Sequence, residues 1–591
     1  MAFFRFINSI LIWRSKNLNH RRYIFILSLF CGVIGGLAAV ILKNAIHYTH
    51  HFLTHGLNES NASIWYMIYP IIGILFTVVF IKLVVKDNIG HGVSRILYAI
   101  SKNKSYLKPH NNYSSMIAST MTIGFGGSVG SEAPIVLTGA SIGSNIGRVF
   151  KLNYKNTTLL IGCGVAGAIA GIFKAPITGV IFGLEVLMLD LTMWSVIPLL
   201  ISGVSGALLA SLLLGKDVIF SFTLNETSYL SNILWYIVLG ILTGLISVFF
   251  TRATNFIEDR FNRFNLWYQK VLIGGLILSL LIFIFPPLYG EGYNTLTTLL
   301  KGNGTDLANT SIFYNLKGHF WAFTGYLIFV MLFKVIAMAS TNAAGGAGGV
   351  FAPTLFVGGL AGYIFSRILN IFDFIHLSEK NFTLVGMAGM MAGVMHAPLT
   401  AIFLIAEITG GYELFIPLIA ASTISYITIM AFEPHSIYTH HLAKRGELLT
   451  HDRDQSAFIL MNIDELIEKD FNKVCPEATL RELVQVFSKS KRNVFPVVDE
   501  EENMVGILTL NDIREIMLKH ELYDVIKVSS IMYFPEVYVS YYDTLSQIAE
   551  KIEESGRYNV PVLKDGKYMG FVSRAKVFSA YRKLIKDFSK E

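Results

Sequence analysis

Charged residues and cysteines are both scarce in this chain. Asp, Glu, Lys and Arg make up 15% of its 591 residues, whereas 53% are hydrophobic, and the mean hydropathy is +0.52. Soluble domains carry about 25% charged residues, so this composition excludes a water-soluble protein and indicates one that crosses a membrane several times. The three cysteines, Cys31, Cys163 and Cys475, lie far apart in the sequence. They therefore predict neither a disulfide framework nor a metal site.

The sequence gives little support for an enzyme or for a nucleic-acid-binding protein. It contains no H-E-x-x-H zinc motif. The segment 162–167, GCGVAG, fits the dinucleotide pattern G-x-G-x-x-G, but it lies in an apolar block, where small residues let membrane helices approach closely. The net charge of +7 comes from basic residues that flank apolar stretches, so it reflects membrane topology. We expect no enzymatic activity, no required cofactor and no nucleic-acid partner.

Apolar stretches of about 20 residues, long enough to cross a lipid bilayer, recur over the first three quarters of the chain. They begin near Tyr23, Trp65, Met193, Leu234, Val271 and Trp321, and two further blocks, 159–189 and 382–432, are broken by Gly and Pro. Cationic residues precede the first stretch and no small-residue cleavage site follows it. This predicts an uncleaved segment with a cytoplasmic N-terminus, in a plasma membrane or a bacterial inner membrane.

Hydropathy falls after about Tyr438, and the rest of the chain is charged. We therefore predict two domains, residues 1–442 in the membrane and residues 443–591 in the cytoplasm. The second domain repeats one pattern of β-rich runs followed by a helix: 494–498, 504–510 and a helix from Asn511, then 559–563, 568–572 and a helix from Arg574. The pattern predicts two small α/β units, at about 465–525 and 526–591.

Two glycine-rich segments of the membrane domain are copies of one another: 126–134, GGSVGSEAP, and 345–353, GGAGGVFAP. Glycine lets the backbone leave helical geometry, and proline needs no amide partner at the first helical position. Each copy therefore predicts a helix N-terminus whose unpaired N–H groups attract an anion. A second pair, APIT at 175–178 and APLT at 397–400, keeps nearly the same spacing. We predict an all-α membrane domain of two inverted repeats of broken helices, with a transport site between them.

The first glycine-rich copy carries Glu132 where an anion would dock. An ionisable residue inside the membrane is costly and by default indicates function. Beside a helix N-terminus its carboxylate can take the place of a permeant anion, and protonation or rotation of the side chain would vacate that place. Glu132 is therefore a candidate gate and proton carrier; the alternative is a carboxylate that only caps the helix.

These motifs resemble those of the CLC chloride channels and chloride/proton antiporters. Residues 130–134 resemble the family's G-x-E-G-P, with Ala133 in place of its second glycine. Residues 349–353 match its G-x-F-x-P, and GHGVS at 90–94 looks like its G-S-G-I-P. The resemblance implies a homodimer with one anion pathway per subunit, and a channel of this family would be voltage-gated. It further implies that Glu132 is the gating glutamate and that the backbone amides of Val350 and Phe351 surround the central chloride.

The chain also departs from the family pattern. The family often has serine where this chain has His91. The imidazole of His91 could donate an N–H to the anion, or it could point away and leave the amides of Gly92 and Val93 to bind the anion. Ser131, next to the gating glutamate, joins the candidate anion-binding residues. Tyr438 stands where the family has a tyrosine that closes the inner side of the site; the alternative is an aromatic residue at the membrane interface.

Antiporters of the family commonly have a second, inward-facing glutamate. Residues 182–186 read FGLEV, so Val186 occupies that position, and valine cannot carry a proton. This favours a passive chloride channel over the alternative, a chloride/proton antiporter in which water or another residue relays protons. We expect Glu185 and its repeat partner Glu407 to hold helix ends and not to move ions.

The C-terminal domain resembles a tandem pair of CBS domains. Residues 506–512, GILTLND, match the pattern in which Thr509 would approach a phosphate and Asp512 would bind the ribose of an adenine nucleotide, whereas the second unit has Lys576 in place of the acid. The resemblance implies at most one ATP, ADP or AMP site; the alternative is a ligand-free dimerising scaffold. A CBS-containing cation transporter is a less favoured function, because it would need converging carboxylates in the membrane.

Overall fold

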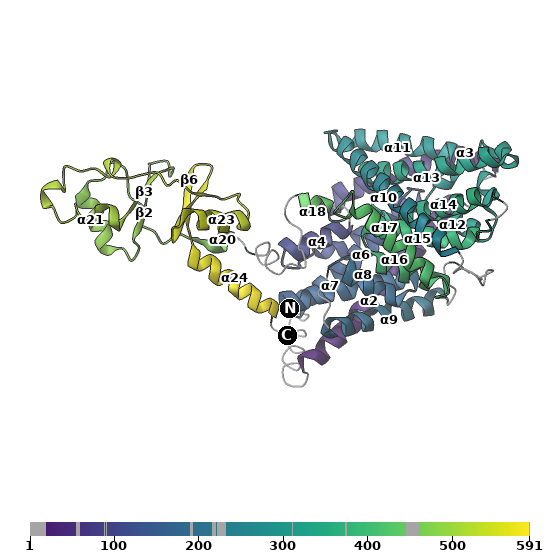
Figure 1. Cartoon of the computed structure of the whole chain (residues 1–591), viewed down its shortest axis with the longest axis horizontal. Coiled ribbons are helices and arrows are strands. Elements are labelled where there is room, and N and C mark those ends of the chain that lie inside the picture. Colours follow the sequence, from purple (N-terminus) through teal and green to yellow (C-terminus); the bar gives the residue numbers. More distant parts are fainter. Residues whose placement is uncertain are drawn as a thin grey trace. The chain divides into compact units, whose positions relative to one another are not determined.

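The computed structural model of the chain describes residues 19–54, 59–87, 89, 92–188, 193–215, 220, 232–309, 311–372, 375–444, 461 and 463–589. The chain divides into two compact units, Met1–Leu448 and Leu449–Glu591 (Figure 1). The first is helical and the second mixes strands with helices, as predicted. The three cysteines are free.

The helices of the first unit vary widely in length. They are α2 (His20–Thr54), α3 (Glu59–Phe80), α4 (Gly92–Lys102), α5 (Ser114–Gly124), α6 (Glu132–Val149), α7 (Tyr154–Phe173), α8 (Pro176–Glu185), α9 (Met193–Leu214), α10 (Ile233–Asn262), α11 (Trp267–Ile284), α12 (Tyr293–Leu300), α13 (Phe320–Ala343), α14 (Phe351–Leu369), α15 (Glu379–Met395), α16 (Pro398–Thr409), α17 (Phe415–Met430) and α18 (His440–Lys444). Within the described residues, eight helices are long and apolar enough to cross a membrane. The six expected spans are confirmed as α2, α3, α9, α10, α11 and α13, and the blocks rich in Gly and Pro form shorter helices such as α8, α16 and α17.

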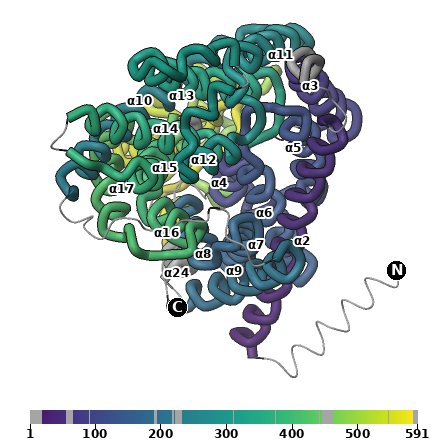
Figure 2. Tube along the Cα trace, turned by 90° about the vertical axis from the view of Figure 1, so that its right-hand side faces the viewer, coloured from purple at the N-terminus to yellow at the C-terminus, as the bar shows by residue number. Residues whose placement is uncertain are grey.

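The two halves of the first unit are related by a local two-fold arrangement. Gly130 and Gly349, which match in the repeat, form an antiparallel bridge with N–O distances of 2.9 and 2.7 Å. Short helices α8 and α16 lie side by side (Figure 2). Since equivalent residues that pair antiparallel are exchanged by a two-fold axis, these contacts support the predicted inversion of the halves.

Two glutamates reinforce this relation at the ends of the short helices. Glu185, at the end of α8, accepts hydrogen bonds from the backbone N of Leu399 (3.0 Å) and Thr400 (2.7 Å) at the start of α16. Reciprocally, Glu407 of α16 accepts from Ile177 (3.0 Å) and from Thr178 (2.8 Å) in α8. The structure thus confirms that both acids hold helix ends.

Glycines bring the inner helices into backbone contact. A Cβ added at Gly164 of α7 would lie 1.9 Å from the carbonyl oxygen of Gly139 in α6, and one at Gly386 of α15 would lie 2.3 Å from that of Gly358 in α14. The G-x-G-x-x-G segment in α7 therefore serves close helix packing. Because of this packing, 94% of the most apolar stretch of α7 is buried inside the protein. In α3 the buried share is only 28%, so most of its apolar surface faces outward.

The second unit contains the two predicted α/β repeats. Its strands are β1 (Ile467–Glu468), β2 (Val494–Val498), β3 (Met504–Thr509), β4 (Val539–Ser540), β5 (Asn559–Lys564) and β6 (Lys567–Ser573). Its main helices are α21 (Leu480–Lys489), α22 (Leu510–Ile513), α23 (Leu545–Ser555) and α24 (Arg574–Ser589). The four predicted β-rich runs are confirmed as strands, and they pair as antiparallel hairpins β2-β3 and β5-β6. Strand β1 joins the second hairpin through the register Ile467↔Val572.

Candidate functional site

The two glycine-rich segments deliver the N-termini of α6 and α14 to one place. A Cβ added at Gly349 would lie 2.8 Å from the Cβ of Ala133 and 3.1 Å from its backbone N. Helix α6 begins at Glu132 and α14 at Phe351. Pro134 and Pro353 therefore occupy the third helical position, and the prediction that they occupy the first was wrong. Both still lie within the first turn, where backbone N–H groups have no helical partner.

The carboxylate of Glu132 fills the space between these two helix ends. Glu132 is only 2% exposed. Its Oε1 accepts a hydrogen bond of 2.5 Å from the hydroxyl of Tyr293, the first residue of α12. A Cβ added at Gly130 would lie 2.0 Å from Oε2 and 3.1 Å from the backbone N of Ala352. The carboxylate therefore lies beside the N-terminus of α14, where the sequence predicts an anion.

A cavity lies next to this meeting point. It is lined by Gly92, Ala133, Asn255, Glu258, Gly348, Gly349, Val350, Ile437 and Tyr438. Predicted residues from three distant parts of the chain, Gly92, Val350 and Tyr438, thus share one cavity. The hydroxyl of Ser94 in α4 donates to the carbonyl oxygen of Tyr438 at 2.7 Å, which fixes this side of the cavity.

Other predicted residues lie close in the sequence to residues that line the cavity. Val93 is 1% exposed on α4, and Phe351 is buried, with its ring stacked on Phe173 at a centroid distance of 5.2 Å. The backbone N of Ser131 donates to Oε1 of Glu291 at 2.9 Å, so this amide already has a partner. His91 lies outside the described residues.

The position of the expected inner glutamate is apolar in three dimensions as well. Val186 is 5% exposed and follows the last residue of α8. Its neighbour Glu185 is engaged with the N-terminus of α16. Neither residue of this pair offers a free carboxylate for proton transfer.

Sequence reasoning missed several ionisable residues near the site. Glu258 of α10 lines the cavity, Glu291 contacts the N-terminus of α6, and Lys334 of α13 is completely buried. A signal for Lys334 was present, because a lysine in the middle of an apolar stretch indicates function or a buried partner. Glu258 and Glu291 gave a weaker signal, since both lie near the ends of apolar stretches, where acids are common.

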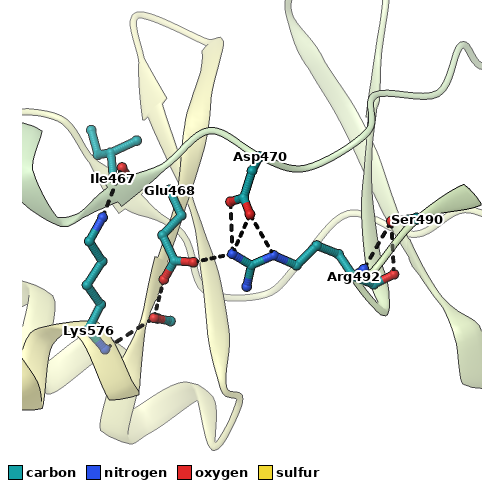
Figure 3. Close-up of polar contacts among 7 residues, drawn as sticks. Ile467, Glu468, Asp470, Ser490, Arg492 and Lys576 are labelled. Atoms are coloured by element: carbon teal, nitrogen blue, oxygen red, sulfur yellow. Dashed lines mark hydrogen bonds and ion pairs between the residues drawn. The ribbon is translucent and has the colours of Figure 1, made fainter.

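In the C-terminal unit, the predicted nucleotide residues contact one another. The backbone N and the hydroxyl of Thr509 both donate to Oδ2 of Asp512 at 2.7 Å, which caps α22. In the second repeat, the hydroxyl of Ser573 donates to Glu468, and Nζ of Lys576 donates to the carbonyl oxygen of Ile467 at 3.5 Å (Figure 3).

Arg492, just before β2, connects the first hairpin to β1, the strand that pairs with β6 of the second hairpin. Its guanidinium donates to Glu468 at 2.6 Å and to Asp470 at 2.7 Å (Figure 3). The hydrogen bond from Arg492 lowers the pKa of Asp470 below its ordinary value. Carboxylates of the chain itself thus accept the hydrogen bonds that the Thr509 hydroxyl and the Arg492 guanidinium donate.

The fold and the site define a multi-pass membrane protein in which helix N-termini from two inverted halves meet. The chain belongs to the voltage gated chloride channel (CLC) family of anion transporters, whose family model matches residues 73–429; the CBS domain model matches residues 463–519 and 528–583.

Named relatives cover most of the membrane unit. The chain is 26% identical over 450 residues to "H(+)/Cl(-) exchange transporter ClcA" of Vibrio cholerae, which covers 73% of this chain and 92% of the relative. It is 29% identical over 338 residues to "Voltage-gated ClC-type chloride channel ClcB" of Escherichia coli, covering 56% and 75%.

Solved structures share the fold. A slow cyanobacterial Cl-/H+ antiporter superposes with a TM-score of 0.62 at 23% identity, covering 73% of this chain and 99% of the other. A eukaryotic CLC transporter superposes with a TM-score of 0.60 at 19% identity, covering 94% and 97%.

Proposed function

We propose that this protein exchanges chloride for protons and that Glu132 is the group that both ions use in turn. The observation that carries this proposal is the position of its carboxylate, buried between the N-termini of α6 and α14. A chloride ion and the carboxylate compete for the same amide dipoles.

Electrostatics links this competition to the proton. Two unit negative charges about 4 Å apart repel by about 4 kcal/mol at an effective dielectric constant of about 20. Chloride therefore enters beside Glu132 only when that side chain rotates away or takes up a proton. Proton binding and chloride occupancy are coupled through one group, which is what exchange requires.

A second acid supports proton movement on the other side of the gate. Val186 leaves the expected inner position without a carboxylate, but Glu258 of α10 lines the cavity that also holds Tyr438 and Asn255. We infer that Glu258 passes protons between the aqueous side of this cavity and Glu132, by way of water in the cavity.

A passive chloride channel is the second candidate function. The observation that favours it is Val186, buried and unable to carry a proton. Relatives of the chain include one named as an exchanger and one named as a channel. The family match removes the support for a cation transporter.

Measurements in liposomes separate the two candidates. Purified full-length protein is reconstituted with a chloride gradient and no proton gradient, and both chloride and pH are recorded. Exchange predicts that chloride efflux drives protons inward against their developing gradient, whereas a channel moves chloride and leaves the pH unchanged. Glu258→Gln should reduce proton flux and spare chloride flux, and Asp306→Asn, a change at an exposed acid, should spare both.

We further propose the setting in which this activity occurs. The working unit is a homodimer with one pathway per subunit, in a plasma membrane or a bacterial inner membrane, with the N-terminus and the CBS unit in the cytoplasm. An adenine nucleotide is the proposed regulator of the CBS unit, and its ribose would have to draw Asp512 away from Thr509.

A further inference from the structure

Two ionisable side chains that take no part in binding the anion contact the glycine-rich segment that carries Glu132. One is Glu291, in the loop before α12, whose Oε1 accepts a hydrogen bond of 2.9 Å from the backbone N of Ser131. Ser131 directly precedes α6, so Glu291 takes one of the unpaired amides at that helix N-terminus. Such a contact stabilises a negative charge on Glu291.

The other is Lys334 in the middle of α13, which is 0% exposed. Its Nζ donates to the hydroxyl of Ser128 and to the carbonyl oxygen of Gly290, both at 2.8 Å. A buried ammonium group at membrane depth is costly unless a negative charge compensates it. Glu291 follows Gly290 directly and is the acid that acts electrostatically on Lys334. These contacts hold the cation in one place.

The surroundings of Glu132 suit a neutral acid better than a charged one. Its Oε2 is buried without a hydrogen-bonding partner among the described residues, an arrangement that penalises a carboxylate strongly. The titratable groups that face Glu132 are Glu291, Tyr293 and Tyr438. The cations that face Glu291 are Lys43 on α2 and Lys334. The side chain of Lys43 is exposed, so solvent screens its charge, whereas Lys334 is buried.

Glu132, Glu291 and the buried Lys334 form a cluster of three ionisable groups, and its net charge depends on where protons are bound. Two acids and one buried lysine are neutral as a set only when one acid holds a proton. Glu291 has the amide of Ser131 and the nearby lysine, so the proton belongs to Glu132. We propose that Glu291 and Lys334 form a fixed charge pair that keeps a proton on Glu132 and so sets the pH at which the anion pathway opens.

This inference rests on the gating role of Glu132 in the proposed function, and Glu291 and Lys334 act through Glu132 as positioning residues. The sign follows from the charges. Removing the negative charge of Glu291 lets Glu132 keep its proton only at a lower pH. Because the pathway opens when Glu132 is protonated, the pH at which it opens also moves toward acid. Removing the positive neighbour leaves two acids together and has the opposite effect.

The test compares the pH dependence of chloride flux for full-length variants in liposomes. Glu291→Gln should move the pH of half-maximal flux by about one unit toward acid, because removal of one neighbouring like charge changes proton affinity by about tenfold or more. Lys334→Met should move it by a similar amount toward alkaline pH. The double variant should return close to the wild-type profile, since both charges are gone, and Glu291→Asp should keep it.

Controls separate an electrostatic role from a structural one. Asp306→Asn, at an exposed acid, should leave the profile unchanged. A purely structural role would lower the amount of folded protein, read by size-exclusion chromatography, or the maximal flux without moving the midpoint. Unmoved midpoints, or shifts of both single variants in the same direction, would overturn the inference. Chloride flux alone is measured here, so failure of proton exchange would leave this test standing.

Discussion

Gly130→Ala is expected to push the Glu132 carboxylate out of its seat without removing the acid. The added Cβ would lie 2.0 Å from Oε2 of Glu132 and 3.0 Å from the Cβ of Ala352. Real Cβ atoms do not approach other atoms as closely as 2.0 Å, and the tip of the glutamate is the part that can move. Gly130 has an ordinary negative φ, so alanine fits the backbone itself.

The size of the effect follows from the contact that is lost. Moving the carboxylate breaks its 2.5 Å hydrogen bond with Tyr293. A hydrogen bond to a charged group contributes about 1.5–3 kcal/mol, so the closed position should lose roughly 10-fold to 100-fold in population. We expect a chloride flux into liposomes that is higher than wild type at alkaline pH, where the unmodified gate is shut. Flux at acidic pH should change little, because the gate is already open there.

A matched control lies at the repeat partner. Gly349→Ala would meet the Cβ and the backbone N of Ala133, which cannot move aside, so we expect lower yield or a lower melting temperature and no rise in flux at alkaline pH. If Gly130→Ala folds and shows the wild-type flux at every pH, the carboxylate does not block the pathway in the position described here.

Three further results are expected. Glu132→Gln should keep chloride flux nearly constant across pH and abolish any proton coupling, as measured with a pH electrode on liposomes. Glu185→Gln and Glu407→Gln should each destabilise the protein by about 1–3 kcal/mol, and by similar amounts, because each weakens charge-assisted bonds to the first turn of the opposite short helix; denaturation in detergent by scanning fluorimetry checks this. Calorimetry with ATP should find at most one site per chain, and Asp512→Ala should weaken it at least tenfold whereas Lys576→Ala should not.

The sequence predicted those parts of the site that depend on backbone chemistry. Glycine-rich segments followed by proline dictate a break and a helix N-terminus wherever they lie, so the ends of α6 and α14 followed from local sequence. Glu132 could be singled out for the same reason, since it lies inside such a segment. The repeat then indicated that two such ends meet, and the bridge between Gly130 and Gly349 is their contact.

The acids and the lysine around that site depend on tertiary packing and could not be placed. Glu291 and Lys334 contact the first glycine-rich segment from positions more than a hundred residues away, through Ser131 and Ser128. Nothing in the spacing of these residues joins them. Glu258 lines the cavity only because α10 passes beside it, which no local pattern encodes.

Bromide binding to Glu132→Ala tests the central claim most directly. Crystals soaked in bromide should show anomalous density where the carboxylate lies in the wild-type chain, beside Gly130 and the amide of Ala352, and wild-type crystals should show none at that point. Density at that point in both proteins, or in neither, would contradict the claim that the carboxylate and the anion compete for one place.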